Sequence, residues 1–265
     1  MDELLDNSTG RLRFDTWNMN GLIVFKEGSK LILSVLQTPS IIEQDQDVTL
    51  KILKIVMSMI CKCLAGGYIN FAICDFYNDC GYTQLTSLVL KAILAQDVSE
   101  VELQPKFKKS LNRFVTDLFR KQTEFLFSKL DASMTNRLYC EVILKSVRSS
   151  HQFMIVDALL TIDQLNQFLY HNIRKPNKKQ QGMMLRIQLE NYRTKYRMAF
   201  YLTLRTLITS IIFECDSFKA NDWIVSRALH SSIVMCELVD MTPEKLAAVA
   251  TRHTHEPSTG GLFFT

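Results

Sequence analysis

The chain has 265 residues and a net charge of +4, with 47% hydrophobic and 22% charged residues. These proportions are ordinary for a folded globular protein, so they exclude wholesale disorder and a membrane protein. The 31 basic residues are interspersed with 27 acidic ones, which argues against a nucleic-acid-binding surface. Nine glycines and five prolines are too few for the many turns of an all-β protein, so the composition favours helices.

The cysteines, the N-terminus and the apolar runs indicate the cellular compartment of the protein and whether it enters a membrane. The seven cysteines are an odd number and lie mostly within apolar runs, which predicts reduced core residues in a cytosolic or nuclear protein. The first residues are acidic, where a signal peptide would need a basic start and an apolar run. The most apolar run, 48–64, is interrupted by Lys51, Lys54 and Lys62, so we expect no membrane insertion.

Apolar residues recur at steps of three and four along most of the chain, which predicts amphipathic helices. In chain order these helices are expected at 21–37, 48–64, 68–79, 83–95, from Pro105 onward, and at 125–130, 134–147, 151–172, about 184–198 and 243–250. Pro39 should end the first helix, and Gly66-Gly67 the second. The buried face of the second helix is predicted to comprise Ile52, Ile55, Val56, Met59 and Cys63. The apolar face of the helix after Pro105 is predicted to comprise Phe107, Leu111, Phe114, Val115 and Leu118. The apolar stripe of the helix at 151–172 is predicted to comprise Ile155, Leu159, Ile162, Leu165 and Leu169.

Residues 204–229 predict a helical hairpin. One apolar face is formed by Leu204, Leu207, Ile208, Ile211 and Ile212. Asp216, Ser217 and Asn221 supply turn and capping oxygens, and Trp223 then opens a second helix. Apolar helices start anew roughly every 20 to 30 residues, so a helix pair approaches the length of a HEAT or armadillo repeat. This spacing favours an all-α, right-handed α-solenoid over an irregular helical domain.

Several segments resemble the C-terminal part of exportin-7-type karyopherins in the importin-β superfamily. The hairpin carries Phe213-Glu214, Trp223 and Ser226-Arg227 in the family's order. Three further colinear segments are Asn20 to Lys30, Leu64 to Asp79 and Ala158 to Pro176. On this basis we expect three regions: an irregular segment at 1–19, HEAT-like repeats at 20–239, and a divergent short helix with a flexible tail at 240–265.

The resemblance implies a binding function in nuclear protein export. The implied partners are protein cargo, nucleoporins and Ran, which such receptors contact mainly through N-terminal repeats that this chain lacks. The implied location is the cytoplasm, the nucleus and the nuclear pore complex. A stand-alone helical scaffold for cytosolic protein–protein interaction is the alternative. Neither function involves nucleic acid.

Catalytic and metal-binding patterns are weak in this sequence. It has no GxxxxGK[ST], GxSxG, HExxH or CxxC motif, so neither an enzyme nor a cofactor is expected. Asp75 and Asp79 could act as an acid–base pair or bind a cation, but a solvated helix end is the simpler interpretation. His253 and His255 could chelate a metal, although with no third ligand in sequence a frayed tail is favoured.

Two sets of residues are candidates for partner contacts. The only dense basic cluster is Arg174, Lys175, Lys178 and Lys179, with Arg186 beyond it. It could be a nuclear localisation signal, a contact for acidic cargo, or a solvated loop between repeats. The aromatic set could form pockets for phenylalanine–glycine repeats or simply pack the core, and comprises Trp223, Tyr68, Phe71, Phe76 and Tyr77.

Overall fold

The computed structural model describes residues 16–38, 46–66, 80–96, 104–149, 151–174, 180–210, 222–240 and 242. In these ranges every regular element is a helix, which confirms the predicted all-α class. The chain divides into two compact units, Met1–Val142 and Ile143–Thr265. The solenoid and the three predicted regions of the chain stay predictions.

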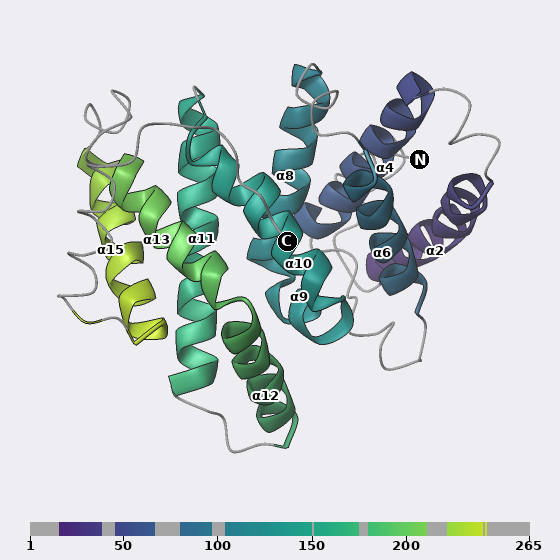
Figure 1. Ribbon diagram of the computed structural model, residues 1–265. Helices are drawn as coiled ribbons and strands as arrows, with labels where there is room; N and C mark the ends of the chain where they lie inside the picture. Colours follow the sequence, from purple (N-terminus) through teal and green to yellow (C-terminus); the bar gives the residue numbers. More distant parts are fainter. Residues whose placement is uncertain are drawn as a thin grey trace. The chain divides into compact units, whose positions relative to one another are not determined.

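The first unit contains six α-helices among its described residues and the start of a π-helical segment (Figure 1). They are α2 (Thr16–Leu36), α4 (Gln46–Gly66), α6 (Gly81–Leu94), α8 (Pro105–Lys121), α9 (Thr123–Lys129), α10 (Ala132–Leu138) and the π-helix Tyr139–Leu144. Helix α4 packs against both α6 and α8, and α2 packs against α6. Tyr82 of α6 contacts two further helices: its ring centroid lies 6.1 Å from that of Phe25 on α2 and 4.8 Å from that of Phe125 on α9.

Proline and glycine set three helix boundaries as predicted. Helix α2 ends at Leu36, shortly before Pro39. Helix α4 ends at Gly66, and α8 begins at Pro105, where the missing proline N–H costs no helical hydrogen bond. Beyond Pro105, the predicted apolar face of α8 is confirmed, since all five members are buried: Phe107, Leu111, Phe114, Val115 and Leu118.

The predicted buried face of α4 is wrong at one position. Ile55 is 60% exposed, whereas Leu53, Met57 and Ile60 are completely buried. The reason is that α4 has two neighbours, α6 and α8, so a wide arc of its surface is covered. Residue spacing alone placed the centre of that arc too close to Ile55.

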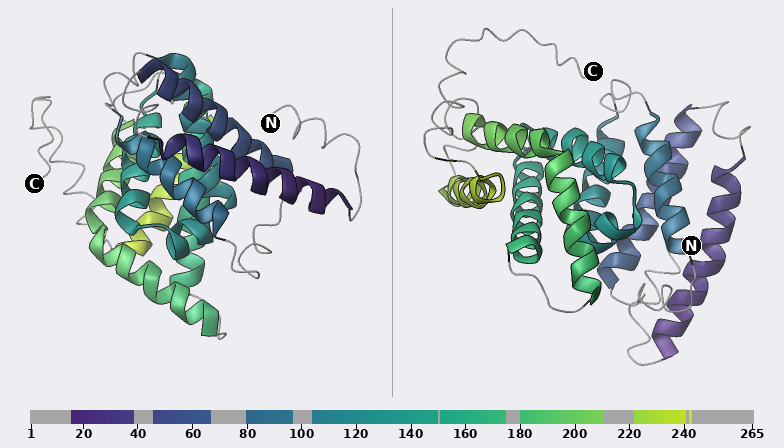
Figure 2. Two further views of the ribbon diagram at one scale, coloured as in Figure 1. Left: turned by 90° about the vertical axis from the view of Figure 1, so that its right-hand side faces the viewer. Right: turned by 60° about the horizontal axis from the view of Figure 1, so that its bottom comes forward.

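The second unit contains four α-helices among its described residues. They are α11 (Gln152–Arg174), α12 (Gln180–Lys195), α13 (Arg197–Thr209) and α15 (Asp222–Leu238). Helix α11 packs against α12 and α15, and α13 packs against the same two helices. Both Figure 1 and the right-hand view of Figure 2 show α15 lying beside α11. The predicted apolar stripe of α11 is confirmed as buried: Ile155, Leu159, Ile162, Leu165 and Leu169.

The predicted hairpin at 204–229 is confirmed where the structure describes it, because α13 and α15 pack together. Leu204 and Leu207 are completely buried, while Ile208 is half-buried. A turn at Tyr196 separates α12 from α13. The polar break of the hairpin and the predicted helices at 68–79 and 243–250 lie outside the described residues. No helix in the described part of the chain is long and apolar enough to cross a bilayer.

Candidate partner-binding site

The predicted basic cluster lies where α11 gives way to α12. Arg174 is the last residue of α11, and α12 begins at Gln180. Lys175, Lys178 and Lys179 lie outside the described residues, so the structure adds nothing to their assignment. Arg186, two turns into α12, is exposed. We call the four residues Arg174, Lys175, Lys178 and Lys179 the basic turn.

The surrounding segment is much more basic than the chain as a whole. Residues 174–197 contain one acidic residue, Glu190, and eight basic ones: Arg174, Lys175, Lys178, Lys179, Arg186, Arg193, Lys195 and Arg197. The formal charge of this segment is therefore eight minus one, or +7, whereas the whole chain carries only +4. Charge of one sign concentrated in one segment attracts partners of the opposite sign.

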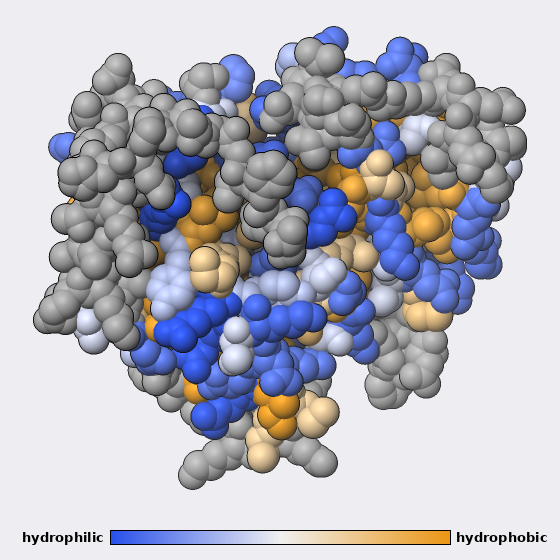
Figure 3. All heavy atoms as spheres, viewed as in Figure 1, coloured by the Kyte–Doolittle hydropathy of each residue, from blue (hydrophilic) through white to orange (hydrophobic). Residues whose placement is uncertain are grey.

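Helix α12 carries apolar side chains on two opposite faces. Leu185, Leu189 and Tyr192 are buried against the rest of the unit. On the other side Met183 is 57% exposed, Met184 60% and Ile187 53%. Figure 3 shows a group of orange and tan spheres over the lower part of α12. We call Met183, Met184 and Ile187 the α12 apolar patch; sequence reasoning missed it because periodicity does not tell which of two apolar faces is covered.

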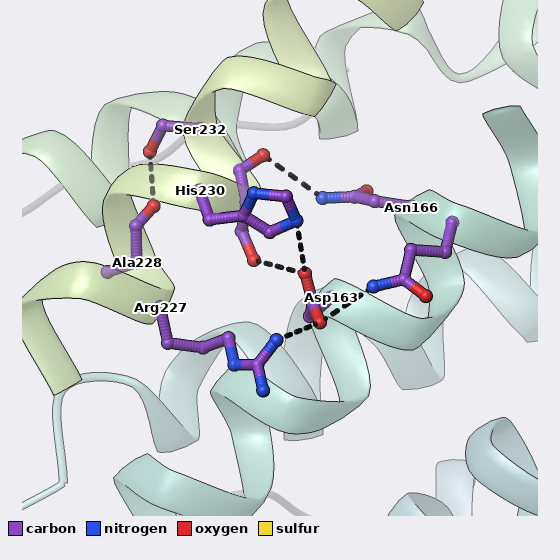
Figure 4. Close-up of polar contacts among 8 residues, drawn as sticks. Asp163, Asn166, Arg227, Ala228, His230 and Ser232 are labelled. Carbon is purple, nitrogen blue, oxygen red and sulfur yellow. Dashed lines mark hydrogen bonds and ion pairs between the residues drawn. The ribbon is translucent and has the colours of Figure 1, made fainter. Parts of the chain in front are cut away.

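A buried carboxylate fixes α11, which leads into the basic turn, against α15 (Figure 4). The side chain of Asp163 on α11 is only 5% exposed. Its Oδ2 accepts hydrogen bonds from Arg227 Nη1 at 2.7 Å and from Gln167 Nε2 at 3.0 Å. Its Oδ1 lies 3.5 Å from the hydroxyl of Ser231 and 3.6 Å from Nε2 of His230. Three residues of α15 thus converge on one acid of α11.

A second buried contact sets the register of these two helices. The amide Nδ2 of Asn166, one turn beyond Asp163, donates to the carbonyl oxygen of Ser231 at 3.2 Å. Both residues are completely buried. A signal for this network existed in the sequence, since Asp163 and Asn166 interrupt the apolar stripe of α11 and buried polar side chains need partners. The partners on α15 could not be named from spacing.

Two arginines of α12 and α13 hold the carboxyl end of α15. Nη1 of Arg193 donates to the carbonyl of Leu238 at 2.8 Å and lies 3.3 Å from a carboxylate oxygen of Asp240. Nη2 of Arg197 donates to the carbonyl of Val239 at 3.4 Å. The last carbonyls of a helix lack intrahelical donors, and cations there are favourable to its dipole. These two arginines therefore stabilise the end of α15 within the unit.

The other candidate residues fall into two groups. Trp223 is 43% exposed, and the guanidinium carbon of Arg227 lies 5.6 Å from the centroid of its ring. The Trp223 side chain is therefore only partly buried. The remaining candidates lie outside the described residues: Tyr68, Phe71, Phe76, Tyr77, Asp75, Asp79, His253 and His255. Within the described ranges, no three His, Cys, Asp or Glu side chains come together in a way that could hold a metal ion.

Two cysteine thiols that the structure describes are poor nucleophiles. Burial, and next the negative charge of Asp117, raise the pKa of the Cys61 thiol to about 12. Burial, and next Glu141, raise the pKa of Cys140 to about 11. The thiolate is the reactive form of cysteine, so both residues are held in the unreactive state near neutral pH.

Comparison with known proteins places the chain beside nuclear transport receptors. It is 26% identical over 242 residues to exportin-7 of Dictyostelium discoideum. It is 24% identical over 246 residues to Ran-binding protein 17 of Mus musculus, and 25% identical over 252 residues to exportin-7-B of Xenopus laevis.

These alignments cover 88% to 89% of this chain but only 22% to 23% of the relatives. The chain thus spans less than a quarter of the length of the curated relatives it matches. No protein-family model matches the chain. No solved structure matches it either. The predicted resemblance is confirmed: over most of its length this chain is similar to part of exportin-7 and Ran-binding protein 17.

Proposed function

We propose that this chain acts in the export of proteins from the nucleus, as a section of an exportin-7-like transport receptor. The observation that carries the proposal is the similarity to exportin-7 and Ran-binding protein 17 over 88% to 89% of the chain. Its mechanism is binding without catalysis, and it uses no cofactor. The receptor moves between nucleus and cytoplasm through the nuclear pore complex, where it contacts nucleoporins.

The physical basis of the mechanism is a stack of HEAT-like helical hairpins that forms a right-handed solenoid. Consecutive helices that pack on one another support this arrangement, as α12 does on α13 and α11 on α12. Such stacks offer extended surfaces, and small rotations between repeats link distant binding events. In the full-length receptor, those rotations would link cargo binding on this section to Ran binding on the N-terminal repeats.

The basic turn is the proposed cargo contact. Its location supports this role, because α11, which ends at Arg174, is held to α15 by the buried Asp163–Arg227 pair. Four cations in six positions would select an acidic surface on the cargo.

The test is a chimera in which this chain replaces the matching segment of Dictyostelium discoideum exportin-7. Export of a fluorescent cargo from nuclei of permeabilised cells is measured, along with retention of that cargo by the immobilised chimera when GTP-loaded Ran is added. We expect the chimera to export cargo and GTP-loaded Ran to change its retention. A chimera with Arg174, Lys175, Lys178 and Lys179 changed to glutamate should retain less cargo.

A matched control changes four exposed cations away from the basic turn to glutamate: Lys51, Lys54, Lys106 and Lys108. Circular dichroism of each chimera verifies that it is folded. A folded chimera whose cargo retention is the same with and without GTP-loaded Ran would contradict the proposed function. If the isolated chain nevertheless held cytosolic proteins together, the stand-alone scaffold would be the correct interpretation.

A further inference from the structure

We infer that the α12 apolar patch and the exposed Arg186 beside it form one docking surface for an acidic amphipathic segment of a partner protein. Such a segment carries apolar side chains on one face and Asp or Glu around them. This inference rests on the proposed function, since it names the chemical class of protein that the receptor would bind through α12.

The apolar half of the surface follows from helix geometry. At about 100° per residue, Met183 and Ile187 lie within about 40° of one another on α12, and Met184 borders them. Leu185 and Leu189 lie on the opposite side, which α11 and α13 flank. The patch is therefore left over after the unit has packed its own core. Methionine side chains are flexible and polarisable, so they adapt to apolar partners of different shapes.

The basic residues of the surface determine that the partner's charge is negative. Arg186 lies within the same two turns as the patch and is exposed, and the basic turn lies immediately before α12 in the chain. The nearest acidic residue on α12 is Glu190, which already pairs with Arg193 at 3.0 Å. An apolar partner with surrounding carboxylates would thus meet both the patch and its cations.

The same charge argues against a second copy of this chain as the occupant. Two copies facing each other through α12 would bring together two segments with a formal charge of +7 each. Like charges placed together across an interface repel and weaken it. A partner segment of negative charge relieves this repulsion.

A membrane surface is also a poorer fit than a protein. Helices that lie in the membrane interface have one large apolar face, rich in tryptophan, phenylalanine and leucine. The exposed side of α12 has two methionines and one isoleucine, while its aromatic residue Tyr192 is buried. The opposite face of α12 is already engaged with α11 and α13, so the helix cannot turn it to a bilayer.

The experiment measures binding of a fluorescein-labelled synthetic peptide to the full chain by fluorescence anisotropy. The peptide carries leucines at helical spacing and glutamates at its other positions. One control peptide has alanine in place of each leucine, and another has lysine in place of each glutamate. The chain variants are Met184→Gln with Ile187→Gln for the patch and Arg186→Glu for the charge. Matched controls are Met198→Gln, which is 76% exposed on α13, and Arg113→Glu, which is exposed on α8.

We expect the peptide to bind the wild-type chain and both control variants. The patch variant should weaken binding by about tenfold, because it removes apolar area that the peptide would bury. The Arg186→Glu variant should weaken it by a comparable factor at low salt and by less at high salt. Neither control peptide should match the affinity of the first.

Four results would overturn the inference. They are a wild-type chain that does not bind the peptide, equal binding by the patch variant, equal binding of the alanine peptide, and binding to vesicles of phosphatidylcholine and phosphatidylserine in preference to the peptide. A wild-type dimer in light scattering that the patch variant dissociates would likewise assign the patch to a second copy. The assay contains neither Ran nor cargo, so peptide binding together with a failed export chimera would reject the proposed function alone.

Discussion

Breaking the buried ion pair between α11 and α15 should destabilise the second unit strongly. In the variant Arg227→Met, Asp163 keeps its place with a side chain only 5% exposed, but loses the cation 2.7 Å away. At an effective dielectric constant of about 20, the Coulomb attraction of two charges at that distance is about 6 kcal/mol before desolvation is subtracted. Removal of one partner of a fully buried pair costs roughly 3–5 kcal/mol. Because Arg227 is itself 32% exposed, we expect a loss of about 2–3 kcal/mol.

An exposed pair of the same length provides the matched control. Nζ of Lys30 lies 2.7 Å from a carboxylate oxygen of Glu27, but these side chains are 60% and 63% exposed. Exposed pairs contribute about 0.2–1 kcal/mol, so Lys30→Met should lower the free energy of unfolding by less than about 1 kcal/mol. Equal separation with unequal burial isolates the effect of burial.

The measurement is urea unfolding followed by tryptophan fluorescence. The chain has two tryptophans, Trp17 and Trp223, and Trp223 lies beside Arg227 in the second unit. In a Trp17→Phe background, fluorescence therefore reports the second unit, and circular dichroism follows the control variant. Arg227→Met combined with Asp163→Leu should return to within about 1 kcal/mol of the parent, because no unpaired buried charge is left.

A loss of unfolding free energy in Arg227→Met no larger than that in Lys30→Met would refute the predicted effect of burial. That effect would also be refuted if adding Asp163→Leu lowered the free energy of unfolding further instead of restoring it. Either outcome would mean that the carboxylate is well solvated, so that α11 is held to α15 by apolar packing alone.

Three further outcomes are expected. Leu53→Ala should lower the free energy of unfolding by about 2–5 kcal/mol in urea titrations, whereas Ile55→Ala on the same helix should change it by less than about 0.5 kcal/mol; similar losses would contradict the observed α4 face. Iodoacetamide at pH 8 should modify exposed Cys80 long before Cys61, whose pKa of about 12 keeps it a thiol until the pH approaches that value, and mass spectrometry that found Cys61 modified first would contradict this. Arg193→Ala should speed amide hydrogen exchange in the last turn of α15, because it removes a charged donor to a helix-end carbonyl, and unchanged exchange there would show that the cap is dispensable.

Much of the fold was predictable because helices are encoded locally. The apolar stripes of α8 and α11 recur at steps of three and four, and each was found buried at every predicted position. Proline and glycine act through their own backbone restrictions, so Pro105 and Gly66 marked a helix start and a helix end without knowledge of any neighbour.

The candidate site was predictable only in part. The basic turn is a run of charges, and such a run is visible in any sequence. The α12 apolar patch was not visible, because Met183 and Ile187 differ from buried Leu185 and Leu189 only in which side of the helix has a neighbour. Helical periodicity identifies faces, but the choice of the face that packs is made by the surrounding helices.

Composition, helical periodicity and short motifs were thus sufficient to predict the all-α class, most helix boundaries and the resemblance to exportin-7-type receptors. The packing of the helices was needed to show that Ile55 faces solvent, that the α12 apolar patch is uncovered, and that Asp163 meets Arg227 across a separation of 64 residues. The two kinds of feature differ in the distance along the chain over which the responsible interactions act. Propensity, capping and spacing act over one or two turns, whereas burial and buried ion pairs depend on segments that only the folded chain brings together.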